Sequence, residues 1–393
     1  MDGPPLNVAV VTKWDPLDSH SWSGTMRSMC NALKRRGVNL TPLGPVRSGA
    51  RMALHCGDMV TQAVFSKSYD YRHSLLVARE YAFRFEHKLA AGNFDVIFAP
   101  VASTEISLLK TDIPIVYMTD ILFPDYMDYY PQCSRLLDFS AAEVSKIEAL
   151  AMRKAKAFIC PAEWVKSRAI GTYGLSEDQV HMLPFGANLE RTPSYEEATE
   201  KRDLSVCRLL FLGVNWERKG GPIAVEVLRL LVNAGIPAEL TVCGCVPPSG
   251  VAHPNMRVIP FLSKRDPVQT EELYQLIRKS TFLLLPTQAD ASPIVLCEAC
   301  AFGLPPIVRD TGGVSGIVED GVNGYKIGRD AGPEAYAQTI MALYKDEDRY
   351  HALSVSSRQA YDRRLNWDAW GEGAQRALES VSKRHQLEVS LVE

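Results

Sequence analysis

The feature that most constrains this chain is the alternation of short apolar runs with helical patterns, separated by turns. The first half carries such runs at residues 6–12, 94–99, 113–118 and 157–160. They are nearly unbroken, as in parallel strands that are buried on both faces. After the first run, Met26, Met29, Cys30 and Leu33 recur at helical spacing, and Gly37 ends that pattern. Alternation of this kind predicts α/β architecture with doubly wound parallel sheets.

The same pattern starts again after a polar segment, residues 189–203, which we interpret as a linker. A helix is predicted over residues 222–234, and further apolar runs follow the linker at residues 208–213, 239–243, 257–259, 282–285 and 306–308. The length of 393 residues also favours two domains. We therefore expect one α/β domain over residues 1–190 and a second over residues 200–370.

The C-terminal stretch predicts a helix, which we assign to residues 371–393 as a separate element. Just before and within it, Trp367, Trp370, Ala374, Leu378 and Val381 fall on one side of a helical pattern. This helix either packs back across the domain junction or caps the second domain.

Composition excludes some classes of function. The net charge of −3 gives no support to a nucleic-acid-binding surface. No apolar run is long enough to predict a transmembrane helix, and the N-terminus lacks the basic region of a secretory signal. The nine cysteines lie mostly in apolar runs, which fits reduced, buried thiols and a cytoplasmic location.

Two cysteine pairs have spacings that also occur in metal and redox sites. Cys243 and Cys245 form a C-x-C, and Cys297 and Cys300 form a C-x-x-C inside a predicted helix. A structural zinc site needs four ligands with matched spacing, and no paired histidine motif accompanies these cysteines. We interpret them as core cysteines, with a metal or redox site as the alternative.

The stretch ADASPIVLCEACAFGLP, residues 289–305, predicts a helix that begins just after a strand. Ser292 is a suitable N-cap, Pro293 a suitable first residue, and Gly303 stands where a left-handed C-cap belongs. The free amides of Ile294 and Val295 would then face the crevice at the carboxyl end of the strand, where helix N-termini bind phosphate.

Two acids flank this helix start, Asp290 and Glu298. They suit a ligand with both phosphates and hydroxyls, because a carboxylate accepts hydrogen bonds from sugar hydroxyls. The alternative is an ordinary capped helix whose acids lie in solvent.

Taken together, D-x7-E, the following A-x-x-x-G-L-P and the block RDTGGVSGIVEDGVNGYKI resemble the signature of the retaining GT-B glycosyltransferases (glycosyltransferase family 4-like, group 1). The resemblance implies two Rossmann-like domains facing across a cleft and a nucleotide-sugar donor, most often a UDP- or GDP-sugar. It places Glu298 on the ribose and Asp290 on the donor sugar. Asp290 stands where the family usually has Glu, and a side chain shorter by roughly 1.5 Å implies a reshaped sugar pocket.

The family also places an Arg and a Lys near the leaving diphosphate. Lys219 in FLGVNWERKGG matches the Lys, whereas Val214 stands at the Arg position, so Arg218 would have to substitute. Fixed cations of this kind stabilise the charge that develops on the leaving group. We identify no D-x-D motif for a divalent metal, so we expect no obligatory metal or other cofactor. The alternative is that both cations are solvated turn residues.

Three further positions enter through the resemblance. Gly24 lies in the loop that touches the diphosphate or the acceptor, and Gly186 lies in a P-x-G segment that shapes the cleft near the donor. Asp120 occupies the strand end where many relatives have a His, and it could orient the acceptor hydroxyl or cap a turn.

The resemblance implies an enzyme that transfers a sugar, with retention of configuration, to a hydroxyl or amine on a small molecule, a glycan or a lipid-linked acceptor. A sugar-nucleotide 2-epimerase of the same fold is the first alternative. A dinucleotide-dependent oxidoreductase would need G-x-G-x-x-G after the first strand, and the loop there lacks it. A non-catalytic sugar-nucleotide-binding protein is the remaining alternative.

Overall fold

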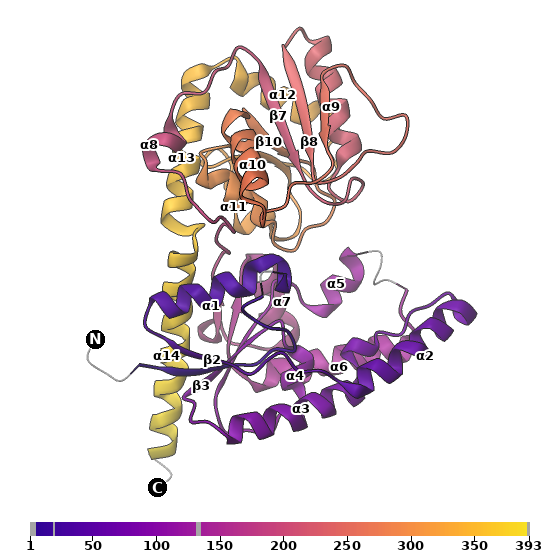
Figure 1. The fold of residues 1–393 in the computed structure, drawn as a ribbon, viewed down its shortest axis with the longest axis vertical. Helices are drawn as coiled ribbons and strands as arrows, with labels where there is room; N and C mark the ends of the chain where they lie inside the picture. Colours follow the sequence, from indigo (N-terminus) through magenta and orange to yellow (C-terminus); the bar gives the residue numbers. More distant parts are fainter. Residues whose placement is uncertain (1–4, 19, 131–134, 391–393) are drawn as a thin grey trace. The chain divides into compact units, whose positions relative to one another are not determined.

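The structure, a computed structural model, describes residues 5–18, 20–130 and 135–390. The chain divides into two compact units (Figure 1). Unit 1 comprises Met1–Leu183 and Trp367–Glu393, and unit 2 comprises Pro184–Asn366. The chain therefore passes between the units twice, and the first crossing comes before the predicted linker.

Unit 1 is built on a parallel six-stranded sheet in the order β2-β1-β3-β4-β5-β6. Its strands are β1 (Asn7–Val10), β2 (Asn39–Pro42), β3 (Val96–Pro100), β4 (Ile115–Met118), β5 (Ala155–Cys160) and β6 (Val180–Met182). Its α-helices are α1 (Thr25–Arg35), α2 (Gly49–Phe65), α3 (Leu75–Ala90), α4 (Ser103–Ser107), α5 (Phe123–Tyr129), α6 (Asp138–Lys154), α7 (Glu163–Tyr173) and α14 (Trp367–Ser390). Short 3-10 turns are η1 (Ser21–Gly24), η2 (Tyr71–His73) and η4 (Glu177–Gln179).

Unit 2 repeats this architecture in the order β12-β11-β10-β7-β8-β9, again with parallel strands. Its strands are β7 (Cys207–Leu212), β8 (Ala238–Cys243), β9 (Met256–Ile259), β10 (Phe282–Leu285), β11 (Pro306–Arg309) and β12 (Tyr325–Ile327). Its helices are α8 (Tyr195–Thr199), α9 (Gly221–Asn233), α10 (Pro267–Lys279), α11 (Ile294–Ala301), η5 (Gly312–Gly316), α12 (Pro333–Tyr344) and α13 (Glu347–Arg364). The prediction of two doubly wound α/β units is confirmed. Each predicted strand is found, with some shifts at the ends, whereas β2, β6 and β12 were not predicted.

The predicted linker, residues 189–203, is instead a packed part of unit 2. It contains α8, which starts in a capping box where Ser194 and Glu197 satisfy each other's backbone amides. Ala198 in α8 is buried, and Arg358 of α13 donates hydrogen bonds to the Pro193 and Ser194 carbonyls at 2.8 and 3.0 Å. The polar side chains of this segment cap α8, and its backbone carbonyls accept hydrogen bonds from α13. Composition alone does not distinguish such a segment from a solvated linker.

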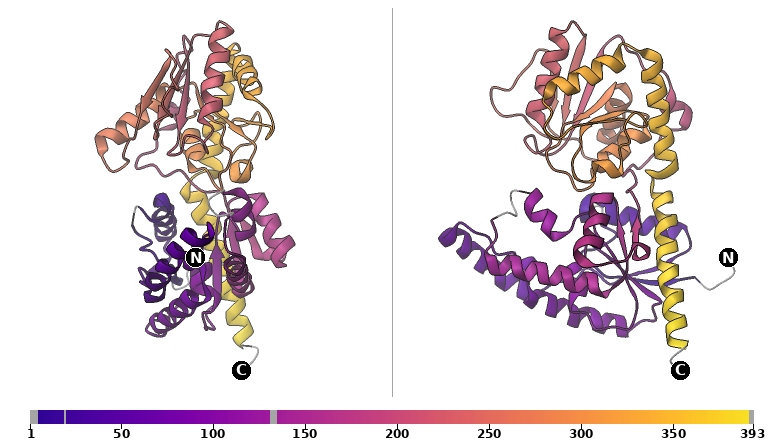
Figure 2. Two further views of the ribbon diagram at one scale, coloured as in Figure 1. Left: turned by 90° about the vertical axis from the view of Figure 1, so that its right-hand side faces the viewer. Right: turned by 180° about the vertical axis from the view of Figure 1, so that it is seen from behind.

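The C-terminal helix α14 packs on unit 1, alongside the strands of that unit (Figure 2). It begins at Trp367 rather than at residue 371. All five predicted apolar positions are buried, and the ring of Trp370 lies 6.2 Å, centroid to centroid, from that of Phe98 in β3. The alternative that this helix caps the second unit is wrong.

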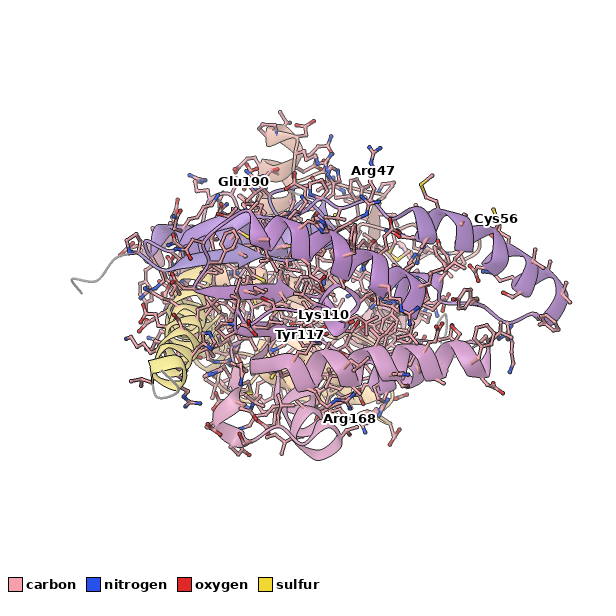
Figure 3. All side chains as sticks on the ribbon, turned by 90° about the horizontal axis from the view of Figure 1, so that it is seen from below. Arg47, Cys56, Lys110, Tyr117, Arg168 and Glu190 are labelled. Carbon is pink, nitrogen blue, oxygen red and sulfur yellow. The ribbon has the colours of Figure 1, made fainter. Side chains whose placement is uncertain are left out.

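Helix α2 contrasts with α14, because none of its described residues is buried. It projects from the sheet, and the exposed Cys56 lies on its outer surface (Figure 3). Its start is fixed by Glu80 of α3, which accepts hydrogen bonds from the Ser48 hydroxyl (2.6 Å) and the Ala50 amide (2.9 Å). Burial opposes ionisation of Glu80, but these hydrogen bonds outweigh it and lower its pKa to about 2.

Candidate functional site

Strand order identifies the crevice of each sheet. In unit 2 the chain runs from β7 outward to β8 and β9, then returns to the other side of β7 as β10. Ligands of open α/β sheets bind at such a reversal, beyond the carboxyl ends of the two strands. The loops after β7 and β10 therefore form the candidate site of unit 2. In unit 1 the same reversal lies between β1 and β3.

The two loops of unit 2 are tied together through their backbones. The Gln288 amide and the Thr287 hydroxyl donate to the Arg218 carbonyl at 2.7 and 3.2 Å. Gly220 has φ +82°, and a Cβ there would lie 2.0 Å from the Pro286 carbonyl oxygen. The first glycine of the R-K-G-G sequence thus permits the close approach of α9 and the β10 loop.

Lys219 and Asp290, two predicted catalytic residues, form an ion pair across these loops. They are only 9% and 8% exposed, so the pair is almost fully buried. Arg218 Nη1 donates to the Ala289 carbonyl at 2.5 Å, which brings the second predicted cation to the same loop. Val214, at the position of the family's Arg, is 70% exposed.

A third loop supports Asp290. The Gly313 amide, in the glycine-rich block after β11, donates to the Asp290 carbonyl at 3.1 Å. A Cβ on Gly313 would lie 1.8 Å from the Ala291 carbonyl oxygen. This contact explains why the T-G-G sequence carries a glycine here: its backbone packs directly on the loop that holds Asp290.

Helix α11 is shorter by one residue at each end than the helix predicted over residues 293–302. The helix begins at Ile294, and Pro293 is the N-cap with φ −75° and ψ 88°. Ser292 is therefore not the N-cap, because the extended ψ of Pro293 turns the chain before the helix starts. The buried Ser292 hydroxyl has no partner among the described residues. Gly303 follows the helix with φ +61°, as predicted.

Ile294 and Val295 do occupy the first turn of α11, where backbone amides have no partner within the helix. The next amide, of Leu296, donates to the Pro293 carbonyl at 2.9 Å. The two predicted amides therefore mark the helix N-terminus that follows the Asp290 loop, next to the reversal between β7 and β10.

Glu298 lies one turn into α11 and is 5% exposed. It forms an ion pair with Lys264, from the loop between β9 and α10. Lys264 also donates to the Asn188 carbonyl at 3.3 Å, and the Cys297 thiol donates to the Phe185 carbonyl at 3.3 Å. The buried segment around Gly186 is thus held against α11, beside Glu298.

The cysteines of the C-x-x-C are fully buried on α11. Burial raises the pKa of both the Cys297 and the Cys300 thiols, so they stay protonated at neutral pH. The described parts of the chain contain no group of three or more His, Cys, Asp or Glu residues placed to hold a metal ion. Burial of Cys297, Cys300 and Cys243 fits the interpretation as core cysteines, whereas Cys245 is only half-buried. Cys133 lies outside the described residues.

Gly24 and Asp120 lie in unit 1. Gly24 has φ +82° and ends a turn in which Trp22 and Ser23 are also left-handed, directly before α1. This backbone needs the conformational freedom of glycine at its last position. The turn belongs to the loop after β1, at the strand reversal of this unit.

Asp120 is the second residue after β4, and Glu148 of α6 fixes its loop. Glu148 accepts hydrogen bonds from the Tyr117 hydroxyl (2.9 Å) and from the Phe123 amide (3.1 Å), on either side of Asp120. Burial raises the pKa of Glu148, and the two hydrogen bonds partly offset that rise. Glu148 and Lys264 were not predicted from the sequence, since nothing in a linear pattern pairs residues 25 or more positions apart.

Comparison with known proteins agrees with this architecture. Residues 25–191 match the model of Glycosyltransferase Family 4, and residues 259–360 match that of Glycosyl transferases group 1. No helix in the described ranges combines the length and apolar character that a membrane span requires.

Curated relatives are similar over half of the chain. A D-inositol 3-phosphate glycosyltransferase of Xylanimonas cellulosilytica is 29% identical over 214 residues, 50% of each chain. A second one, from Catenulispora acidiphila, is 30% identical over 207 residues, 48% of this chain and 49% of the relative. The chain thus matches these relatives over about half of their length.

Solved structures share the whole fold at low sequence identity. Sucrose-phosphate synthase from Thermosynechococcus elongatus superposes with a TM-score of 0.66 at 15% identity, over 98% of this chain and 100% of that one. Anabaena HepE, solved in complex with UDP and glucose, gives 0.60 at 12% identity, over 95% and 100%. With the two family matches falling on the two sheets, the chain belongs to the glycosyltransferases and has their GT-B fold.

Proposed function

We propose that the chain transfers a sugar from a nucleoside diphosphate sugar to a hydroxyl acceptor, with retention of configuration. The observation that carries this proposal is the convergence of Lys219, Asp290 and the start of α11 at the strand reversal between β7 and β10. This one crevice offers cations and amides for a diphosphate and carboxylates for hydroxyls.

The diphosphate would bind at Lys219, Arg218 and the first-turn amides of α11. Negative charge grows on the leaving phosphate as the glycosidic bond breaks, and preorganised donors stabilise it without reorganisation. Because these groups supply the positive potential, we propose that no metal ion is required. If chelation with EDTA abolished turnover in metal-free buffer, this part of the proposal would be wrong.

Asp290 would accept hydrogen bonds from the hydroxyls of the transferred sugar, and Glu298 from the ribose. Retention follows if the acceptor attacks on the face from which the phosphate leaves. The acceptor oxygen then bonds to the anomeric carbon, the bond from that carbon to the phosphate oxygen breaks, and the released phosphate takes the acceptor proton. Asp120 of unit 1 would orient the acceptor hydroxyl.

Several named relatives guide the choice of donor and acceptor. HepE was solved with UDP, which makes UDP-sugars the first donors to test and GDP-sugars the second. Curated relatives carry the name D-inositol 3-phosphate glycosyltransferase, so a polyol is the first acceptor class to test. We also propose a cytoplasmic location, where the buried cysteines would remain reduced.

The test is a thermal-shift screen of the purified protein against UDP-, GDP-, ADP- and dTDP-sugars. We expect stabilisation by at least one of them, and loss of that stabilisation in Glu298→Ala. A donor that stabilises the protein but is converted to its 2-epimer without any acceptor would favour the epimerase alternative. No shift with any donor would contradict the assignment of the donor site.

A further inference from the structure

The ion pair between Lys264 and Glu298 was not predicted from the sequence, and the proposed reaction assigns no role to Lys264. We propose that Lys264 is a positioning residue: it pairs with the Glu298 carboxylate and orients it so that Glu298 can accept a ribose hydroxyl of the nucleotide. This inference rests on the proposed function, because it concerns the same nucleotide site.

Burial is the first reason why Glu298 needs a partner. Its side chain is 6% exposed, and its helical neighbours Cys297, Ala299 and Cys300 are buried and apolar or uncharged. Burying a carboxylate in such surroundings is costly unless a cation or several hydrogen-bond donors compensate its charge. Lys264 supplies the compensating charge.

Lys264 is itself held in place. Its ammonium group bridges Glu298 and the Asn188 carbonyl, so it joins α11 to the segment that contains Gly186. The turn that carries Lys264 is fixed by Gln269, whose side-chain oxygen accepts from the Ser263 amide at 2.8 Å. Asp266 caps α10 directly after it, accepting from the Val268 amide at 2.9 Å. The lysine therefore approaches Glu298 from a rigid turn.

The geometry leaves one acceptor position open. Lys264 occupies Oε1 of Glu298, and among the described residues no group donates a hydrogen bond to Oε2. A hydroxyl is the natural donor to this oxygen, and a hydrogen bond to an ionised carboxylate is stronger than one to a neutral group. A phosphate is excluded there by charge. The Lys264 side chain beside it is 40% exposed to solvent.

The experiment measures the affinities of uridine diphosphate and of its 2′-deoxy and 3′-deoxy analogues by isothermal titration calorimetry. If the wild type binds guanosine diphosphate instead, the corresponding guanosine nucleotides are used. The wild type should bind the ribonucleotide about 10-fold more tightly than at least one deoxy analogue, since a hydrogen bond to a charged group is lost. Lys264→Met should weaken ribonucleotide binding about 10-fold and leave binding of that deoxy analogue nearly unchanged, so the discrimination disappears. Glu298→Gln should do the same, and the double variant should be no worse than either.

Two further variants complete the design. Lys279→Met removes an exposed lysine at the end of α10 and should retain full discrimination. Lys264→Arg keeps the positive charge and should retain most of the discrimination. Lys264→Gln, which also lacks the charge, replaces Lys264→Met if that variant does not fold. Because discrimination is a ratio of affinities within one variant, a loss of stability alone does not change it.

Two results would overturn the inference while leaving the proposed function intact. Lys264→Met could keep the discrimination of the wild type, or it could weaken the ribonucleotide and the deoxy analogues equally, which would make Lys264 a phosphate ligand. If the wild type bound none of the uridine, guanosine, adenosine and deoxythymidine diphosphates, the proposed function would fall, and this inference with it.

Discussion

The ion pair of Lys219 and Asp290 allows the most quantitative prediction. Asp290→Asn removes the negative charge but keeps the size of the side chain, so the buried Lys219 loses its charge partner. Breaking a fully buried pair costs about 3–5 kcal/mol, because the remaining charge stays desolvated. Both residues keep some contact with solvent, 9% and 8%, which lets water recover part of this cost. We expect the free energy of unfolding of unit 2 to fall by about 2–3 kcal/mol.

A double-mutant cycle isolates the ionic contribution. Lys219→Met should also destabilise unit 2, whereas the double variant Lys219→Met/Asp290→Asn leaves neither charge unpaired. It should therefore be more stable than the sum of the single effects predicts, by about 2 kcal/mol. The assay is urea unfolding followed by hydrogen exchange and mass spectrometry, read on peptides from the loop between β10 and α11. Strictly additive effects would refute the coupling.

The same variants test the division of labour between the two acids. Asp290→Asn should lower turnover more than 100-fold, because losing a transition-state contact raises the barrier by about 3 kcal/mol. The nucleotide affinity should change little. Glu298→Ala should instead weaken nucleotide binding. If both variants showed equal, small effects on turnover and on binding, this assignment of roles would be wrong.

Two predictions concern stability elsewhere. Gly220→Ala should lower the free energy of unfolding by about 3 kcal/mol, because the backbone is left-handed and the new Cβ would clash with Pro286. Gly235 is also left-handed, at φ +77°, but faces open space, so Gly235→Ala should cost only about 1 kcal/mol. Equal losses in chemical denaturation would refute the close approach of the two loops. Glu80→Gln should destabilise the protein near neutral pH, and the gap to wild type should shrink as the pH falls. The pKa of Glu80 is lowered to about 2, so its contribution is present above about pH 4.5 and is lost towards pH 2. A gap that stayed constant in thermal melts from pH 7 to pH 2.5 would show that the ionised form does not cap α2.

The sequence predicted the α/β class because buried parallel strands and amphipathic helices leave strong periodic patterns. It placed β10 at its observed bounds and α11 within one residue at each end. The prediction of a linker failed at residues 189–203, because the backbone carbonyls of this segment accept hydrogen bonds from Arg358 of α13. The N-cap of α11 was predicted at Ser292, because serine is favoured at that position. The structure has the N-cap at Pro293 instead.

In the candidate site, motif spacing brought Lys219, Asp290 and Glu298 to one crevice, and the structure places all three in unit 2 around the loops that follow β7 and β10. Their partners could not be predicted in the same way. Lys264 stands 34 positions before Glu298, and Glu148 stands 25 positions after Phe123. Such pairs depend on how strands and helices pack, which a local pattern does not encode. The contact between Gly313 and the Asp290 loop was likewise invisible, although its glycine was part of the quoted motif.

The most direct test of the account is proton NMR of a reaction with the donor that stabilises the protein most, recorded before the free sugar can mutarotate. Transfer to a polyol acceptor, or to water, should release nucleoside diphosphate and give a sugar with the anomeric configuration of the donor. A product with the opposite configuration would contradict retention. A 2-epimer, or an unchanged donor that nevertheless binds, would contradict glycosyl transfer itself.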